Sequence, residues 1–297
     1  MGYSLLSRFR GTFLGVAIAE SKTSKVDRDD RHFNLIAQSA HSLIRCGGLN
    51  LSDWQLQCQN EEKPISPSAY CCALLPIALY YHEDESRLAQ QLKRAISLWP
   101  EIDSRESDLI ALGWAIAWAI KQTTEVATNP DIFARLETAK KTAPPVVGQN
   151  LEKISSVLAE SASLERAMVE LNQNNAPDSA AIALGFYCFL STAENFHISI
   201  SRAARTQPQP HLTTLLTSAL SGAYNGVAGI PLTTKSLSAS ATEIGQQKIV
   251  QLFTVADRLF ASWLGLDHLA GDRQKNSVKS QSIAVTAPNL FRHYGGN

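Results

Sequence analysis

The sequence predicts an all-α protein, built as a single large domain of orthogonally packed helices. Apolar residues recur at three- and four-residue steps, the spacing of one helical face, and runs that read as strands are nearly absent. With 44 % hydrophobic residues in 297, the chain has ample material for a core. The clearest break, Ala143-Pro144-Pro145, is short and has apolar helical patterns on both sides. We therefore expect one domain over residues 1–270 and a polar, flexible tail over 271–297.

The stretch over residues 212–231, LTTLLTSALSGAYNGVAGIP, is the one around which we expect the other helices to pack. It has no charged residue, and its leucines recur on one helical face. A second stripe offers small residues against which another helix could pack closely: Ser218, Ser221, Gly222 and Asn225. Gly226, Gly229 and Pro231 indicate the helix end. The stretch is too interrupted by polar residues and glycine to span a membrane.

The other helices are predicted from apolar periodicity and from start and stop signals. In chain order they cover residues 4–20, 33–45, 51–58, 67–81, 85–98, 104–122, 131–141, 150–160, 164–173, 179–190, 191–204 and 242–266. In the first helix, Arg8 and Arg10 are expected to face solvent. Pro76 should kink the helix over 67–81 or divide it into two. Three residues are suited to cap the helices that they precede or begin: Ser104, Asp178 and Thr242.

Composition excludes several classes of function. Lys+Arg and Asp+Glu both number 27, so no net charge attracts nucleic acid or an anionic membrane. The five cysteines fit no CxxC or metal-finger spacing, and Cys71-Cys72 lie in an apolar run where inert packing is favoured over a reactive thiolate. An odd cysteine count and the lack of a secretory signal indicate reduced thiols. We therefore expect a soluble, cytoplasmic protein with no nucleic-acid and no membrane partner.

Several motifs together resemble one known family. SALSGAYNGVAGIP, after an apolar run, resembles the C-terminal signature of the ADP-ribosylglycohydrolase (dinitrogenase-reductase-activating glycohydrolase) family, roughly GGDTDT, a helix, then GAxxGxxxIP. Arg8, Gly11, Gly15 and Ala17 follow the family opening RxxGxxxGxAxGDAxG, although Ala19-Glu20-Ser21 replace its Gly-Asp-Ala. AHSLI, PIALYYHED and the long middle helices complete the order, so the resemblance covers roughly residues 4–266. It implies that family's all-α fold and ADP-ribosyl hydrolysis.

The same resemblance implies a site for two Mg²⁺ ions that this chain does not preserve. The family holds these ions with aspartates of a TDDT motif and of GGDTDT, because hard cations prefer charged oxygen ligands. Alignment on the AHSLI helix places residues 30–33 (DRHF) on TDDT, and alignment on SGAYNG places residues 207–212 (QPQPHL) on GGDTDT. None of the metal-binding aspartates is retained, unless a slip of one or two residues brings in Asp29 or Asp30. We therefore expect no cofactor, no catalytic residue and a pseudoenzyme.

Six residues are predicted to line the remnant cleft: Glu20, Asp29, Asp30, His32, His211 and Asn225. His32 and His211 each fall on an aspartate position, so they could approach each other, and with Asp30 they could bind Zn²⁺ or another borderline metal. The alternative, which we favour on the spacing, is that both are ordinary loop or cap histidines. The acidic run around Asp27 is either a displaced metal cluster or, as we favour, a solvated loop. Trp114 and Trp118 could line a nucleotide pocket, but we favour a place in the core.

Three functions remain open at this point. The first is a binding or regulatory protein with an unidentified protein partner, whose cleft holds an ADP-ribose-like ligand without cleaving it. The second is a hydrolase that cleaves an ADP-ribosyl or related N- or O-glycosidic bond with a rearranged metal site. The third is a structural subunit of an assembly, tethered by its C-terminal tail.

Overall fold

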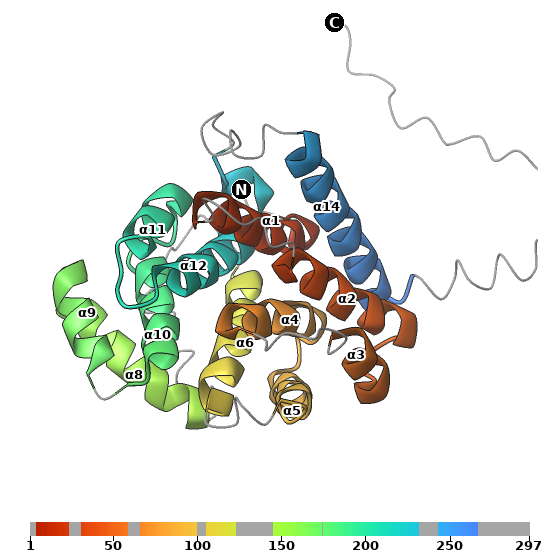
Figure 1. Cartoon of the computed structure of the whole chain (residues 1–297). Coiled ribbons are helices and arrows are strands. Elements are labelled where there is room, and N and C mark those ends of the chain that lie inside the picture. Colours follow the sequence, from red (N-terminus) through yellow and green to blue (C-terminus); the bar gives the residue numbers. More distant parts are fainter. Residues whose placement is uncertain are drawn as a thin grey trace, which may run out of the picture.

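The computed structural model describes residues 4–23, 31–58, 66–99, 105–122, 145–173, 175–231 and 243–266. Within these ranges it contains α-helices, one short 3-10 turn and no strand, which confirms the all-α class (Figure 1). The helices are α1 (Leu5–Thr23), α2 (Arg31–Cys46), α3 (Leu51–Cys58), α4 (Pro67–Tyr80), α5 (Glu85–Ile96), α6 (Glu106–Lys121), α8 (Pro145–Ala159), α9 (Leu164–Asn172), α10 (Pro177–Leu190), α11 (Phe196–Ala203), α12 (Pro210–Asn225) and α14 (Glu243–Trp263).

Several sequence predictions lie outside the described residues. They are the helix over 131–141, the tail over 271–297, the acidic residues Asp27, Asp29 and Asp30, and the caps Ser104 and Thr242. The other predicted helices are all present, with ends that differ by a few residues.

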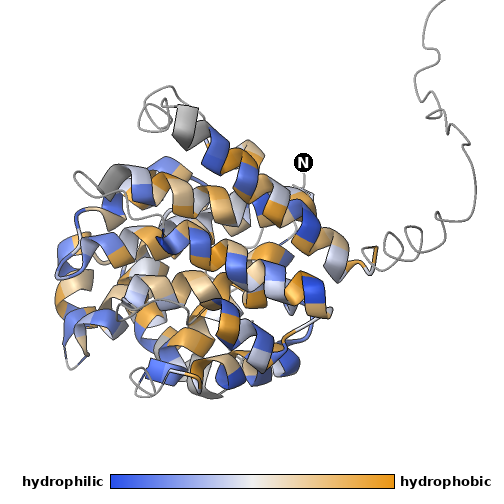
Figure 2. Ribbon diagram, turned by 45° about the vertical axis from the view of Figure 1, so that its right-hand side comes forward, coloured by the Kyte–Doolittle hydropathy of each residue, from blue (hydrophilic) through white to orange (hydrophobic). Residues whose placement is uncertain are grey.

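Helix α12 is the centre of the helical body, as the sequence predicts. All its residues from Leu212 to Asn225 are buried, and it contacts α1, α10, α11 and α6 (Figure 1). Its own apolar and small residues explain this position, because no charged side chain has to reach water. Surrounding helices such as α5 mix hydrophobic and hydrophilic residues along their length (Figure 2). Trp114 and Trp118 stack in the core, as favoured from the sequence.

Helices α1 and α12 pack in direct backbone contact through small residues. A Cβ atom built on Gly11 would lie 2.3 Å from the carbonyl oxygen of Gly222, and one built on Gly15 would lie 2.1 Å from that of Ser218. No side chain fits at such distances, so the predicted small-residue stripe is confirmed. The pairing moves four residues forward on α1 and four back on α12, so the two helices run antiparallel. One turn further along, the end of α1 must lie beside the start of α12.

Arg8 does not face solvent, contrary to the sequence prediction. Its side chain is buried, with 3 % exposed, and its Nη1 donates hydrogen bonds to the carbonyl oxygens of Ala119 (3.0 Å) and Ile120 (2.8 Å). These carbonyls belong to the last turn of α6, where a positive charge is favourable, and the oxygen of Ala119 also accepts a hydrogen bond from the backbone N–H of Gln122. Arg10 is partly exposed and pairs with Asp257 of α14, with contacts of 2.5 and 2.6 Å.

Two further predictions concern local structure. Pro76 does not divide its segment, because α4 continues through it as one helix, which leaves the predicted kink as the alternative. Asp178 does not cap α10, which begins one residue earlier at Pro177. The carboxylate of Asp178 is buried instead and lies 2.5 Å from Arg105, while it accepts a hydrogen bond from Gln209. Both outcomes depend on neighbouring helices that local sequence does not reveal.

The cysteines are unpaired, as predicted. Four of them are buried, but Cys46 at the end of α2 is exposed, which corrects the expectation that all are buried. Among the described residues, no helix combines the length and the apolar character that crossing a bilayer requires.

Candidate functional site

Three helix ends meet beside the crossing of α1 and α12. Glu20 lies in the last turn of α1, while His32 and His211 are the second residues of α2 and α12. The antiparallel crossing explains why residues so distant in sequence come together: one turn beyond the contact of Gly15 with Ser218, Glu20 faces the first turn of α12. Helix α2 then begins next to the same place.

The three side chains form a compact group, the Glu20–His32–His211 cluster. Oε1 of Glu20 lies 3.0 Å from Nε2 of His211 and 3.1 Å from Nδ1 of His32. The two imidazole rings are 5.7 Å apart between centroids. One donor atom from each residue lies within 4.8 Å of the other two, and no other group of this kind occurs in the described part of the chain.

His32 is held from its far side by α4. Its Nε2 lies 2.9 Å from Oγ of Ser68, which in turn lies 3.0 Å from Oγ of Ser66. Only 8 % of His32 is exposed. Its Nδ1 is fully buried and makes no well-aligned hydrogen bond, although it lies close to Glu20. The position of the ring is therefore set by Ser68, and Nδ1 points into the cluster.

The cluster is open to solvent on one side. The side chain of His211 is 39 % exposed, whereas those of His32 and Glu20 are nearly buried, at 10 % and 11 %. Solvent therefore meets the cluster on the side of His211.

The electrostatics of the cluster favour a negatively charged Glu20. Burial by itself raises the pKa of Glu20, but the hydrogen bond with His211 and the adjacent imidazole of His32 outweigh that effect and lower the pKa to about 2. At neutral pH one carboxylate therefore faces two imidazoles. Cys72, one turn after Ser68 on α4, responds to the same charge: burial first, and then Glu20, raise the pKa of its thiol well above the ordinary value. That thiol stays protonated and is no nucleophile.

The structure brings together some of the predicted cleft residues and not others. Glu20, His32 and His211 meet, whereas Asn225 lies at the opposite end of α12, about 21 Å away at 1.5 Å per residue. The amide of Asn225 donates hydrogen bonds to the carbonyl oxygens of Ala193 (2.7 Å) and Ser221 (2.9 Å), so it does not join the other three residues. Asp29 and Asp30 lie outside the described residues.

The approach of His32 to His211 follows from alignment of two separate motifs, and the structure confirms it. That prediction took Asp30 as the third ligand, whereas the acidic residue found between the two rings is Glu20. A signal for this existed, because Glu20 occupies the acidic position of the GDA motif in the first helix. Nothing in the sequence pointed to Ser68, which reaches His32 only through the packing of α2 on α4.

The donor atoms of the cluster do not fit a pair of Mg²⁺ ions. Mg²⁺ requires near-octahedral oxygen coordination and is usually held through carboxylates. The cluster supplies a single carboxylate, and its other two donors are imidazole nitrogens. Two imidazoles with one carboxylate are instead a set that binds zinc and similar divalent transition metals.

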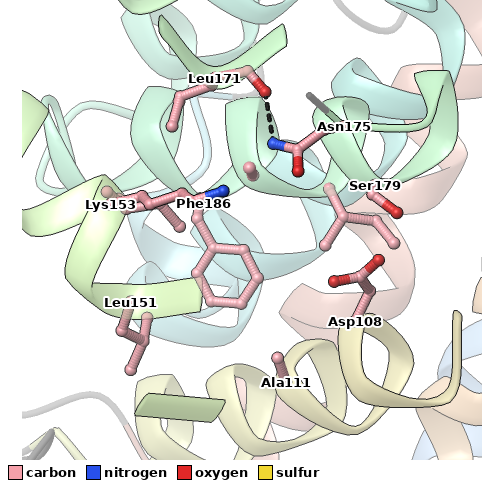
Figure 3. A pocket seen from close by; sticks show the side chains of 11 residues that line it. Asp108, Ala111, Leu151, Lys153, Leu171, Asn175, Ser179 and Phe186 are labelled. Atoms are coloured by element: carbon pink, nitrogen blue, oxygen red, sulfur yellow. Dashed lines mark hydrogen bonds between the residues drawn. The ribbon is translucent and has the colours of Figure 1, made fainter. Parts of the chain in front are cut away.

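Two cavities elsewhere in the described residues are too small for a nucleotide, since ligand pockets commonly span about 300–1,000 Å³. One, enclosed by α6, α8, α9 and α10, has a volume of about 20 Å³, which is room for one water. Asp108, Asn175 and Ser179 give it a polar side opposite Phe186, and Asn175 donates to the carbonyl oxygen of Leu171 (Figure 3). Another, of about 100 Å³, lies between α2 and α14 beside Phe33.

Comparison with known proteins identifies the family to which this chain belongs. A family model described as ADP-ribosylglycohydrolase matches residues 37–266, which is most of the chain. A search of curated proteins found no match. The matched region includes His211 and all of α12, but it begins after Glu20 and His32. With its all-helical fold and this match, the chain belongs to the ADP-ribosylglycohydrolase family.

Proposed function

We propose that this chain is a binding or regulatory protein of the ADP-ribosylglycohydrolase family that does not hydrolyse ADP-ribosyl bonds with a pair of Mg²⁺ ions. One observation carries the proposal. Where α1, α2 and α12 meet, the residues that the structure describes offer a single carboxylate, Glu20, already engaged by the imidazoles of His32 and His211.

The physical reason is the charge that two hard cations need. Magnesium-dependent hydrolysis uses the ions to orient the substrate and to activate a water, and anionic oxygens must hold those ions in place. Neutral imidazoles bring no negative charge. With one carboxylate between them, two dications would repel each other with little compensation, so Mg²⁺ binding at millimolar concentrations is not expected.

What remains is a scaffold suited to recognition. The small-residue crossing of α1 and α12 still brings three helix ends to one place, and His211 is accessible there. In this proposal an ADP-ribose-like ligand binds beside His211 without being cleaved. An unidentified protein partner then binds the ligand-bound form of the chain.

The test measures ligand binding and turnover on the same preparation of the full chain. We expect ADP-ribose to raise the melting temperature by mass action, Mg²⁺ or Mn²⁺ alone to leave it unchanged, and an ADP-ribosylated peptide to release no ADP-ribose. A His211→Ala variant should lose the ADP-ribose shift. Magnesium-dependent release of ADP-ribose by the wild-type chain would contradict the proposal.

A hydrolase with a rearranged metal site is the second candidate, and the Glu20–His32–His211 cluster is the observation that favours it. This candidate predicts hydrolysis of the same peptide with a transition metal and none with Mg²⁺. If no metal tested supports hydrolysis, the hydrolase candidate is excluded and the binding-protein proposal is retained.

A further inference from the structure

We propose that Glu20, His32 and His211 bind one divalent transition-metal ion of the zinc class at the junction of α1, α2 and α12. The inference rests on the proposed function only in taking the Mg²⁺ pair to be lost. It is a statement about metal binding and does not require the protein to be an enzyme.

The spacing of the donor atoms carries the first step. Bonds of about 2.0–2.1 Å to a tetrahedral zinc ion place two ligand atoms about 3.3 Å apart. In the cluster, Oε1 of Glu20 lies 3.0 Å from Nε2 of His211 and 3.1 Å from Nδ1 of His32, and all three donor atoms lie within 4.8 Å of one another. Small side-chain rotations would therefore bring the three atoms onto a common ion. No movement of the helices is needed.

The orientation of His32 is the second, independent observation. Metal-binding histidines commonly use one ring nitrogen for the metal and donate from the other to a neighbouring acceptor. Nε2 of His32 lies 2.9 Å from Oγ of Ser68, which fits the donating role. In that tautomer Nδ1 carries a lone pair directed toward the Glu20 carboxylate, and two such atoms 3.1 Å apart repel unless a cation lies between them.

Burial makes this arrangement hard to explain without a cation. Nδ1 of His32 is fully buried and has no well-aligned hydrogen bond, and a buried polar atom in that state costs free energy of folding. A proton shared with Glu20 would relieve the repulsion only in part, because the alignment is poor. A metal ion would take the lone pairs of both residues at once.

The ligand types select the metal. Imidazole with one carboxylate suits Zn²⁺, Fe²⁺, Co²⁺ and Ni²⁺, whereas Mg²⁺ and Ca²⁺ prefer oxygen ligands throughout. Cys72 does not complete the set, because its Sγ is not among the donor atoms that lie within 4.8 Å of one another. Three protein ligands leave a coordination position free, and the exposed side of His211 is where water or a ligand oxygen would occupy it.

The experiment is a metal titration of the full chain after treatment with a chelator and desalting. Isothermal titration calorimetry with Zn²⁺, and visible absorption with Co²⁺ as a spectroscopic substitute, should both report one ion per chain. The cobalt spectrum should show the intense bands of a four- or five-coordinate site with nitrogen and oxygen ligands. Zn²⁺ should also raise the melting temperature, while Mg²⁺ should not.

Variants assign the ion to the cluster. His211→Ala removes a partly exposed ligand and should fold normally while losing zinc binding, and Glu20→Gln should do the same. Ser68→Ala keeps all three ligands and should weaken binding about 10–100-fold through the orientation of His32. His41→Ala, an exposed histidine on the same helix as His32, is the matched control and should bind zinc like the wild type.

The outcomes separate this inference from the proposed function. No stoichiometric zinc binding, or equal binding by the wild type and His211→Ala, overturns the inference and leaves the proposed function standing. Stoichiometric binding that requires His211 and Glu20 supports the inference, whether or not ADP-ribose is released. The proposed function fails on a different result, which is magnesium-dependent turnover.

Discussion

Gly11 of α1 and Gly222 of α12 pack so closely that a Cβ atom on either residue would lie within 2.3 Å of the carbonyl oxygen of the other. Their contact sets the register of the antiparallel crossing, and that register places Glu20 next to His211. The site is thus positioned by residues that themselves carry no functional group.

Substitution Gly222→Ala should therefore destabilise the fold, because the added methyl group meets a backbone atom that cannot move aside. We expect a loss of about 3 kcal/mol or more in the free energy of unfolding by urea, although alanine alone favours a helix by about 1 kcal/mol. Gly185→Ala is the matched control, since its Cβ would lie 3.2 Å from the side-chain Cβ of Leu216. It should cost far less, and equal losses for the two variants would refute the backbone-contact argument.

Arg8→Met should lower the free energy of unfolding substantially, although the sequence pattern predicts that Arg8 faces solvent. The substitution removes two hydrogen bonds from a buried guanidinium to the carbonyl groups of Ala119 and Ile120 at the end of α6. We expect a loss of about 2–4 kcal/mol in urea unfolding. Arg10→Met, which breaks a partly exposed pair with Asp257, should cost less than about 1 kcal/mol. A similar cost for both would show that the α6 carbonyls are not held by Arg8.

The buried pair of Asp178 and Arg105 gives another prediction. Asp178→Ala leaves the cation of Arg105 without its carboxylate, and also removes the acceptor for Gln209 at the entry to α12. The loss should be about 3–5 kcal/mol, as for other buried pairs that lose one partner. The double variant Asp178→Ala with Arg105→Met should recover part of that loss. No recovery in this double-mutant cycle would mean that the two residues are not coupled.

His82 should make the protein less stable below neutral pH. It is buried against Phe9 and Trp263, and burial lowers its pKa, while the hydrogen bond to the carbonyl oxygen of Leu79 opposes that effect. The unfolded chain therefore takes up a proton that the folded chain resists. This contribution to stability is complete above the unfolded pKa of about 6.5 and is lost as the pH falls toward the lower folded value.

Melting temperatures between pH 7.5 and pH 5.5 test this prediction. The wild type should lose stability across this window, and His82→Phe should lose less, because phenylalanine takes up no proton. His197→Phe, on the exposed side of α11, is the control and should follow the wild type. A wild-type slope that persists in His82→Phe would assign the pH dependence to other groups.

The sequence alone predicts the helices well because the signals for them are local. Apolar periodicity and the small-residue stripe on α12 depend only on neighbours within a few turns. The sequence also indicates that two distant histidines could approach each other, since alignment with the family motifs places each of them on an aspartate position. The errors concern residues whose environment is supplied by another helix, and Arg8 and Asp178 are of this kind.

The sequence by itself determined that this chain is all-α and that its uncharged central helix is buried, and it led us to expect that the metal-binding aspartates of the family motifs are replaced. Only the tertiary structure decided which side chains meet: Glu20 between the two imidazoles, Ser68 beside His32, and His211 on the exposed side. The reason is physical. Helix formation depends on contacts a few residues apart, whereas the meeting of three helix ends depends on the register of one backbone crossing.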